Sequence, residues 1–284
     1  MKQKTKEQAP VTEQYIPDLD IVYPDKPDDR MASFKILYDV TVDENYPFLE
    51  KSLRYKIGRL LSYLLIFVPA RIVSFFRYRL KIEGRKNLRK HRKLLKDGAM
   101  TVCNHVQRWD FMFVQMAVRY RTAYFPVWKE QLKGPDKNWI RWAGGIPIPD
   151  DIQTMKYFNR AFDEIRAKKK WIHVYPETSR FDYFPWIRPF KKGVFSMAYK
   201  YNLPVLPMVI CWRKPSPITV DNIFRFFKGI KKKIPQITIR IGEPLLFDTE
   251  LGRKEAVQKM RKDCHEVMVL LAGIKDNPYP AEGD

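Results

Sequence analysis

The sequence predicts an α/β fold with a mixed, mainly parallel sheet flanked by helices. One observation is a set of short apolar runs with the length of buried strands, at 99–103, 122–127, 171–175, 204–211 and 236–241. A second is a set of longer segments with helical periodicity, at about 110–120, 152–169, 193–201 and 250–272. Strands that alternate with helices of about ten to twenty residues are typical of a sheet covered by helices. A chain of 284 residues, 45% of them hydrophobic, is long and apolar enough to bury such a core.

Three regions follow from composition. Residues 1–47 are rich in Pro and Asp without clear periodicity and are predicted to form an irregular arm over the domain. Residues 48–80 are apolar and basic and form a predicted membrane-interfacial helical segment. Residues 81–284 carry the α/β pattern and form the predicted catalytic domain.

The segment 48–80 contains an uncharged, apolar run from residue 60 to residue 70, interrupted by Pro69. A membrane-spanning helix needs about 20 apolar residues, so this run falls short of a span. We therefore expect a helix or helix pair that lies in the membrane interface, with Arg and Tyr at its ends. The alternative is an ordinary core helix packed on the sheet.

The chain carries a formal net charge of +21, and the charge is unevenly distributed. Residues 1–50 contain six Lys or Arg against eleven Asp or Glu, whereas the rest contains 47 against 21. Such a field attracts polyanions: nucleic acid, an anionic membrane or a phosphorylated substrate.

The segment 224–233 (FRFFKGIKKK) interleaves aromatic rings with cations. We expect it to lie on an anionic membrane; stacking on nucleic-acid bases is unlikely, and a solvated basic loop is the alternative.

The three cysteines, Cys103, Cys211 and Cys264, have neither the number nor the spacing of a disulfide framework or a zinc site. Two of them lie in strand-like runs, so buried free thiols and a reducing, intracellular compartment are expected. The first thirty residues show no apolar signal region. No cluster has metal-ligand spacing, so no metal is expected.

Two polar clusters follow strand-like runs. Residues 104–110 (NHVQRWD) contain His105 and Asp110, and residues 175–180 (YPETSR) follow the run that ends near residue 174. Within one helix the side chains of His105 and Asp110 would point about 140° apart, so they meet only if His105 precedes the helix and Asp110 begins it. They would then form a general-base dyad; the alternative makes Asp110 a helix cap and His105 a loop residue.

These clusters are similar to conserved blocks of the glycerolipid acyltransferases. Residues 104–110 resemble the first block, 144–149 (GGIPIP) occupy the place of the second, 175–180 resemble the third (usually FPEGTR), and 202–208 (NLPVLPM) resemble the fourth. The blocks occur in the family's order, and the resemblance covers about residues 80–245. It implies a glycerolipid acyltransferase-like fold and an O-acyltransferase of the 1-acylglycerol-3-phosphate (lysophosphatidic acid) class.

The resemblance also implies roles for single residues. His105 would deprotonate the acceptor hydroxyl and Asp110 would orient His105. The implied substrate-binding residues are Asn104, Gly145, Glu177 and Arg180. Arg180 suits a phosphate, while Glu177 would position Arg180 or an acceptor hydroxyl, or else brace its loop. The acyl donor would be acyl-CoA or acyl carrier protein, with no cofactor required, and the enzyme would sit on the cytoplasmic face of the cell membrane as a peripheral or monotopic protein.

The departures from the family pattern concern the acceptor. Asp150 stands where the second block commonly has a phosphate-binding arginine, and Arg141, Lys129 and Lys156 are the candidate replacements. A different acceptor, such as a lyso-aminolipid, is therefore an alternative, as is a non-catalytic basic module that binds membrane or nucleic acid. His173, inside a strand, is expected to be packed. Ser179 lacks the G-x-S-x-G turn of a serine nucleophile.

Overall fold

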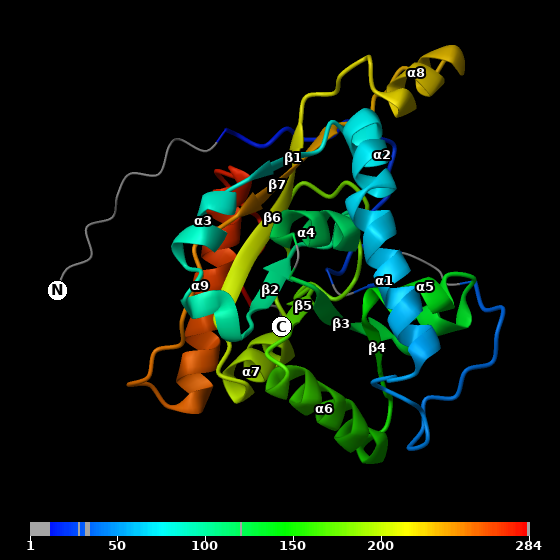
Figure 1. The fold of residues 1–284 in the computed structure, drawn as a ribbon. Coiled ribbons are helices and arrows are strands. Elements are labelled where there is room, and N and C mark those ends of the chain that lie inside the picture. Colours follow the sequence, from blue (N-terminus) through cyan, green and yellow to red (C-terminus); the bar gives the residue numbers. More distant parts are fainter. Residues whose placement is uncertain (1–11, 28, 32–34, 120, 283–284) are drawn as a thin grey trace.

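A computed structural model describes residues 12–27, 29–31, 35–119 and 121–282, and these contain one seven-stranded sheet (Figure 1). Its order is β1-β7-β6-β2-β5-β3-β4, and β6 and β7 are the antiparallel neighbours while all other neighbouring strands are parallel. The predicted mixed, mainly parallel sheet is therefore confirmed. The strands are β1 Lys81–Glu83, β2 Met100–Cys103, β3 Ala123–Trp128, β4 Gly145–Ile148, β5 Trp171–Val174, β6 Val205–Arg213 and β7 Gln236–Ile241.

Helices cover both faces of this sheet. The four predicted from periodicity are found with similar bounds, as α4 Asp110–Val118, α6 Ile152–Ala167, α7 Lys192–Lys200 and α9 Arg253–Ala272. The N-terminal helices are α1 Leu53–Phe67 and α2 Pro69–Tyr78. The shorter elements without a prediction are α3 Arg85–Lys90, α5 Lys137–Ala143, α8 Val220–Phe227, the strands β1 and β4, and the 3-10 turns η1 Leu94–Asp97 and η2 Lys129–Lys133. Each is too short for its periodicity to stand out.

The core consists of two apolar layers, one on each side of the sheet. Successive side chains of a strand point to opposite faces. Met100 and Val102 of β2 accordingly pack with α6, α7 and α9, whereas Cys103 packs on the other face with α4. All three cysteines are buried free thiols, as expected.

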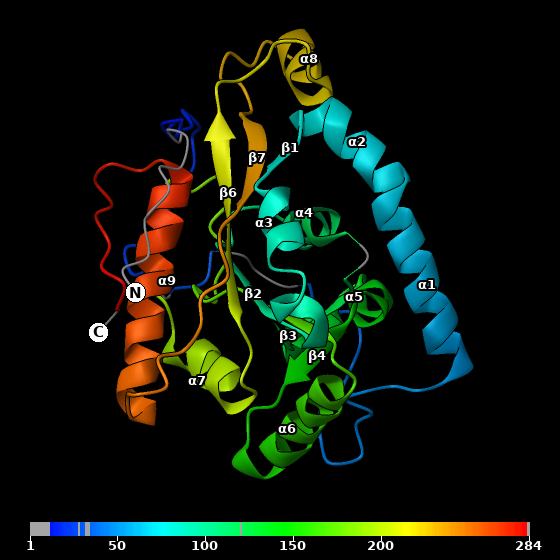
Figure 2. The same cartoon turned by 60° about the vertical axis from the view of Figure 1, so that its left-hand side comes forward.

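The N-terminal helices form an almost continuous rod along one side of the molecule (Figure 2). Pro69 is the first residue of α2, where a proline costs no hydrogen bond. The backbone N–H of Val68 donates to Leu64 O at 3.1 Å, and Val68 is both the C-cap of α1 and the N-cap of α2. The structure thus has a helix pair with its boundary at Pro69, which is one of the expected arrangements. Taken together, residues Leu53–Tyr78 are long and apolar enough to cross a membrane by length and composition, with 22% of the apolar window buried. The same length and composition suit a helix that crosses a bilayer and one that lies along its surface.

The rod is attached to the domain through α1. The buried hydroxyl of Tyr63 donates to the carbonyls of Ala123 and Ala143, each at 3.2 Å. Gly58 lies against the indole of Trp142, where a Cβ atom would come within 2.5 Å of the ring. This face of α1 therefore packs on α5 and the end of β3, while Leu60, Leu61, Leu64 and Leu65 are exposed.

The described part of the arm runs over the domain without helix or strand. The N–H of Tyr15 donates to Trp212 O at 3.2 Å, and the ring of Tyr23 packs on Phe184 at a centroid distance of 4.8 Å. Further along, the N–H of Leu37 donates to Lys133 O at 2.8 Å. The arm thus passes from β6 towards η2, which carries it beside the carboxyl ends of the strands.

Candidate active site

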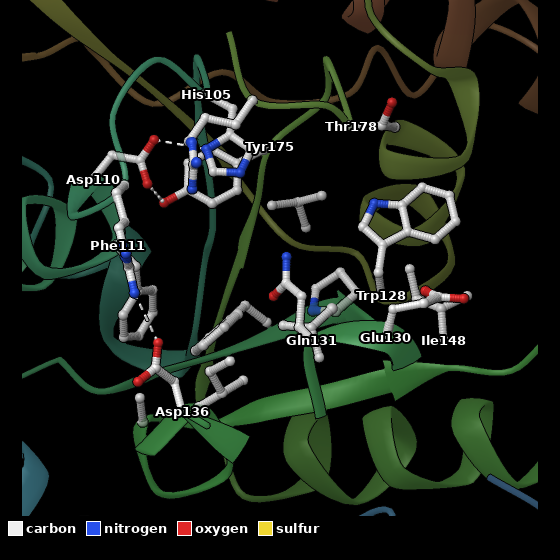
Figure 3. Close-up of a pocket in the computed structure, with 18 of the residues that line it drawn as sticks. His105, Asp110, Phe111, Trp128, Glu130, Gln131, Asp136, Ile148, Tyr175 and Thr178 are labelled. Atoms are coloured by element: carbon white, nitrogen blue, oxygen red, sulfur yellow. Dashed lines mark hydrogen bonds and ion pairs between the residues drawn. The ribbon is translucent and has the colours of Figure 1, made fainter. Parts of the chain in front are cut away.

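His105 and Asp110 meet at the carboxyl end of β2. Asp110 is the first residue of α4, and His105 lies in the preceding loop. The imidazole Nδ1 and Asp110 Oδ2 are 2.7 Å apart. The same oxygen accepts the N–H groups of Val106 at 3.2 Å and Gln107 at 3.4 Å. The helix cap is Trp109 and no side chain caps α4, so the carboxylate of Asp110 orders the preceding loop and binds the histidine instead of capping the helix (Figure 3).

Tyr175 completes this arrangement from the neighbouring strand, directly after β5. Its ring stacks on the His105 imidazole at a centroid distance of 4.0 Å and an interplanar angle of 10°. Its hydroxyl donates to Asp110 Oδ1 at 2.7 Å. Burial, and next the negative charge of Asp110, raise the pKa of Tyr175 well above its ordinary value, so the hydroxyl stays protonated. Tyr175 therefore holds both members of the pair; sequence reasoning missed this role, although Tyr175 opens the second polar cluster.

Tyr175→Phe should lower the kcat of the enzyme about tenfold to a hundredfold. The substitution keeps the stacking ring but removes the hydrogen bond that holds the Asp110 carboxylate, and a hydrogen bond to a charged group contributes about 1.5–3 kcal/mol. The kcat of the purified variant is compared with that of Tyr157→Phe, a tyrosine on α6 outside the site. An unchanged kcat would show that the Tyr175 hydroxyl does not position Asp110.

Glu177 is buried beneath the dyad loop, with a relative exposure of 1%. Its Oε2 accepts the N–H of His105 at 3.0 Å, and its Oε1 accepts the N–H of Arg188 at 2.9 Å. The Arg188 guanidinium, itself buried, lies 3.1 Å from Oε2. The oxygens of Glu177 thus hold the loop and Arg188, as in the loop-bracing alternative, while a role of Glu177 in substrate binding stays a prediction. A cue for this ion pair exists in the sequence, since Arg188 is a lone charge within the apolar run 186–190.

Two other residues expected to bind substrate have structural roles and do not line the cavity. Asn104 is buried; its amide donates to Ile210 O at 2.9 Å and its Oδ1 accepts the Ile210 N–H at 2.8 Å, which ties the end of β2 to β6. Gly145 begins β4, and a Cβ atom there would lie 2.9 Å from Ile140 O. These contacts give both residues a structural role, and their role in substrate binding stays a prediction.

The second histidine near the site, His173, is fully buried as expected. Thr101 Oγ1 lies 2.9 Å from its Nδ1. Burial lowers the pKa of His173 to about 3, so this ring is neutral at physiological pH. Of the two histidines, His105 is the one that lines the cavity.

The dyad lies in the wall of a cavity of about 690 Å³. The carboxyl ends of β2, β5, β3 and β4 surround it, which is where ligands bind in open α/β sheets. Figure 3 shows His105, Asp110 and Tyr175 together on one side, with Trp128, Gln131 and Ile148 across from them. Apolar side chains form much of the remaining wall, namely Phe125, Val127, Trp139, Ile140, Ala143, Phe158, Val194 and Met197.

Cationic side chains also line this cavity, but they are not those proposed to replace the missing arginine. Lys129 pairs with Asp150, Arg141 donates to the carbonyls of Pro47, Phe48 and Gly145, and Lys156 lies over the ring of Tyr157. The cations that line it are Lys35, Arg108, Arg180 and Lys191. Arg180 pairs with Asp182 at 2.9 Å and Arg108 with Asp136 at 3.0 Å. Arg180 was predicted at the site; the others come from the arm, the dyad loop and the start of α7, so only the fold brings them together.

Comparisons with known proteins found similar acyltransferases. Residues 79–211 match the family model described as Acyltransferase. An uncharacterized acyltransferase of Schizosaccharomyces pombe is 26% identical over 138 residues, which cover 47% of each chain, so this chain spans about half the length of that relative. The crystal structure of the 1-acyl-sn-glycerophosphate (LPA) acyltransferase PlsC from Thermotoga maritima is 22% identical, with a TM-score of 0.48 over 77% of this chain and 84% of that one. The family model covers all four of the blocks noted above. The resemblance to the glycerolipid acyltransferases is therefore confirmed over residues 79–211, which include His105 and Asp110.

Proposed function

We propose that this protein is an O-acyltransferase that moves a fatty acyl group from a thioester to the hydroxyl of a lysophospholipid, most specifically 1-acylglycerol-3-phosphate. The observation that carries the proposal is the His105–Asp110 pair at 2.7 Å in the wall of a large, mainly apolar cavity. The pair can deprotonate a hydroxyl, and the cavity can hold an acyl chain.

The dyad geometry supports a direct transfer. Asp110 engages Nδ1 of His105, so Nε2 is the ring nitrogen that remains to accept the proton of the acceptor hydroxyl. The oxygen attacks the thioester carbonyl carbon, and the tetrahedral intermediate collapses with cleavage of the C–S bond. The departing thiolate takes the proton back from the imidazolium, which restores neutral His105. Asp110 stabilises the imidazolium between these two steps. The chemistry as proposed uses no metal and no prosthetic group.

The acceptor side of the proposal rests on the cations that line the cavity. Arg180 and Lys191 supply positive charge on the side of the second cluster, and Arg108 supplies it next to the dyad. Guanidinium groups match the geometry of a phosphate and hold it by charge-assisted hydrogen bonds. A lysolipid with a phosphate headgroup therefore fits this cavity better than a neutral one.

Arg180→Ala should raise the KM for 1-acylglycerol-3-phosphate about tenfold to a hundredfold, since a hydrogen bond to a charged group contributes about 1.5–3 kcal/mol. The KM for a monoacylglycerol, which has no phosphate, should change little. Arg253→Ala, at the exposed start of α9, is the matched control. If the variant has the same KM as the wild-type enzyme for each of the two acceptors, Arg180 does not bind the phosphate.

The test of the activity itself is thiol release by purified protein from acyl-CoA and from acyl carrier protein, with a panel of lysolipids. Transfer to 1-acylglycerol-3-phosphate ahead of lysolipids with other headgroups is the expected result. An absence of thioester consumption with every donor and acceptor would contradict the proposal and favour a non-catalytic basic module.

Asp150 favours a second candidate for the acceptor. Asp150 occupies the place of the arginine in the second block, and it pairs with Lys129 instead of lining the cavity. One cation of the family pattern is thus replaced by a neutralised pair, which suits an acceptor with less negative charge, such as a lyso-aminolipid. Faster transfer to a lyso-aminolipid in the same panel would select this candidate.

We further propose that the protein works at the cytoplasmic face of the cell membrane, on an anionic lipid surface. The apolar helix Leu53–Tyr78 and the excess of basic residues after residue 50 support this location. Nucleic acid is not the proposed partner, because the cavity and the dyad call for a lipid and a thioester.

A further inference from the structure

Helix α8 has its apolar face towards solvent. Val220, Ile223, Phe224 and Phe227 follow the spacing i, i+3, i+4, i+7, which places them on one side of the helix. This side is exposed: Phe224 has a relative exposure of 62% and Phe227 one of 79%. Phe226, at the edge of the stripe, is exposed as well. A surface helix of a soluble domain normally turns such a stripe towards the core.

The polar face of α8 is the one that holds the helix on the domain. The buried amide of Asn222 donates to Ser216 O at 2.8 Å and to Ile234 O at 3.0 Å, and accepts the Ile234 N–H at 2.7 Å. Arg225 Nε donates to Lys232 O at 2.6 Å. Since these polar contacts fix the orientation, the apolar stripe is presented outwards by the fold itself.

Helix α8 lies beside the C-terminal end of α2, which also carries exposed aromatic rings. Figures 1 and 2 both show α8 beside the C-terminal end of α2. Arg77 of α2 forms a two-pronged ion pair with Asp221 of α8, with distances of 3.0 and 3.2 Å. Near this junction Phe75 and Phe76 of α2 are also exposed. The ion pair thus joins two helices that are far apart in sequence, and both helices carry exposed aromatic rings.

The charged side chains next to the apolar stripe of α8 indicate which partner binds there. Lys228, Lys231 and Lys233 are exposed directly after α8, whereas Lys232 is paired with Asp18 and Asp20. Exposed rings flanked by unburied ammonium groups complement an anionic bilayer, in which rings sit at the headgroup boundary and cations meet phosphates. A protein groove would match the rings but not three flanking lysines.

We propose that α8 is a second lipid-contacting element, which inserts Phe224 and Phe227 into an anionic membrane and is held in register with α2 by the Arg77–Asp221 pair. The inference rests on the proposed function only in that the acceptor is a membrane lipid. Vesicle binding is measured without turnover, so a failure here is distinct from a failure of acyl transfer.

The first experiment is sedimentation of the full chain with vesicles of phosphatidylcholine, or of phosphatidylcholine and phosphatidylglycerol in equal parts. Phe224→Ser/Phe227→Ser should lower the partition onto the anionic vesicles at least about tenfold, because two apolar rings stay in water. Replacing Lys228, Lys231 and Lys233 by Gln should reduce the preference for the anionic vesicles. The control, Leu270→Ser, alters an exposed leucine of α9 on the other side of the molecule and should change neither.

The second experiment detects membrane contact of α8 itself. It is needed because the rod Leu53–Tyr78 could be sufficient to bind the protein to vesicles. The native cysteines are buried, so Phe227→Cys can be labelled selectively with an environment-sensitive fluorophore. Its emission should shift to the blue on anionic vesicles. An unchanged emission on vesicles that bind the protein would overturn the proposal. So would a blue shift without lipid that grows with protein concentration, because a second copy of the chain would then cover α8.

Discussion

Replacing His105 with alanine should lower the kcat of acyl transfer about a hundredfold to ten-thousandfold, the contribution expected of a positioned general base. The structure leaves no second base in this position among the described residues, because His173 is buried and its pKa is lowered to about 3. The measurement is thiol release from acyl-CoA at saturating acceptor. Asp110→Asn should show a large loss as well, since it removes the charge that stabilises the imidazolium.

His91→Ala is the matched control for the histidine substitution. His91 is a partly exposed histidine that pairs with Glu243, away from the cavity, so its loss should leave the rate close to that of the wild-type enzyme. Circular dichroism would show that each variant folds. Activity that survives His105→Ala in a folded protein would rule out the dyad mechanism.

Glu177→Ala should lower the free energy of unfolding by about 3–5 kcal/mol, the usual cost of removing one partner of a buried ion pair. The substitution leaves the buried Arg188 guanidinium without its carboxylate and also leaves the N–H groups of His105 and Arg188 without their acceptor. Denaturant unfolding followed by fluorescence measures the change. Activity should fall too, because the His105 backbone loses its anchor.

Asp263→Ala gives the comparison, because Asp263 pairs with Lys259 on the exposed face of α9. Exposed pairs of this kind contribute less than about 1 kcal/mol. Adding Arg188→Met to Glu177→Ala should restore part of the lost stability, since the unpaired charge is then gone. If Glu177→Ala proves as mild as Asp263→Ala, the buried pair is not the brace of this loop.

Much of the fold could be predicted because the central strands and long helices have strong patterns. β2 and β5 are short, fully buried runs, and α6 and α9 are long enough to show helical periodicity. β1 and β4 have only three and four residues and depend on pairing with a neighbouring strand, which a local pattern does not record. The sequence predicts a break at Pro69, and Pro69 is indeed the first residue of α2, a position that tolerates proline.

The candidate site was predicted unevenly for a similar reason. A motif shows which side chains stand together in sequence, and it placed His105, Asp110 and Arg180 at the cavity. It does not show which way a side chain points, so Asn104, Glu177 and Gly145 were expected at the substrate although packing and loop bracing account for them. Tyr175 and Lys191 line the cavity without having been assigned a role.

By itself, the sequence determined the α/β class and indicated acyl-transfer chemistry, because strand periodicity and the His-x-x-x-x-Asp motif are local properties of the chain. Only the tertiary structure decided the partners: Tyr175 on His105, Arg188 for Glu177, and Arg77 for Asp221. Each pair joins residues from different elements, and the last spans more than half of the chain. Their distances depend on how the sheet and helices pack, since burial and hydrogen bonding are satisfied over the whole domain at once.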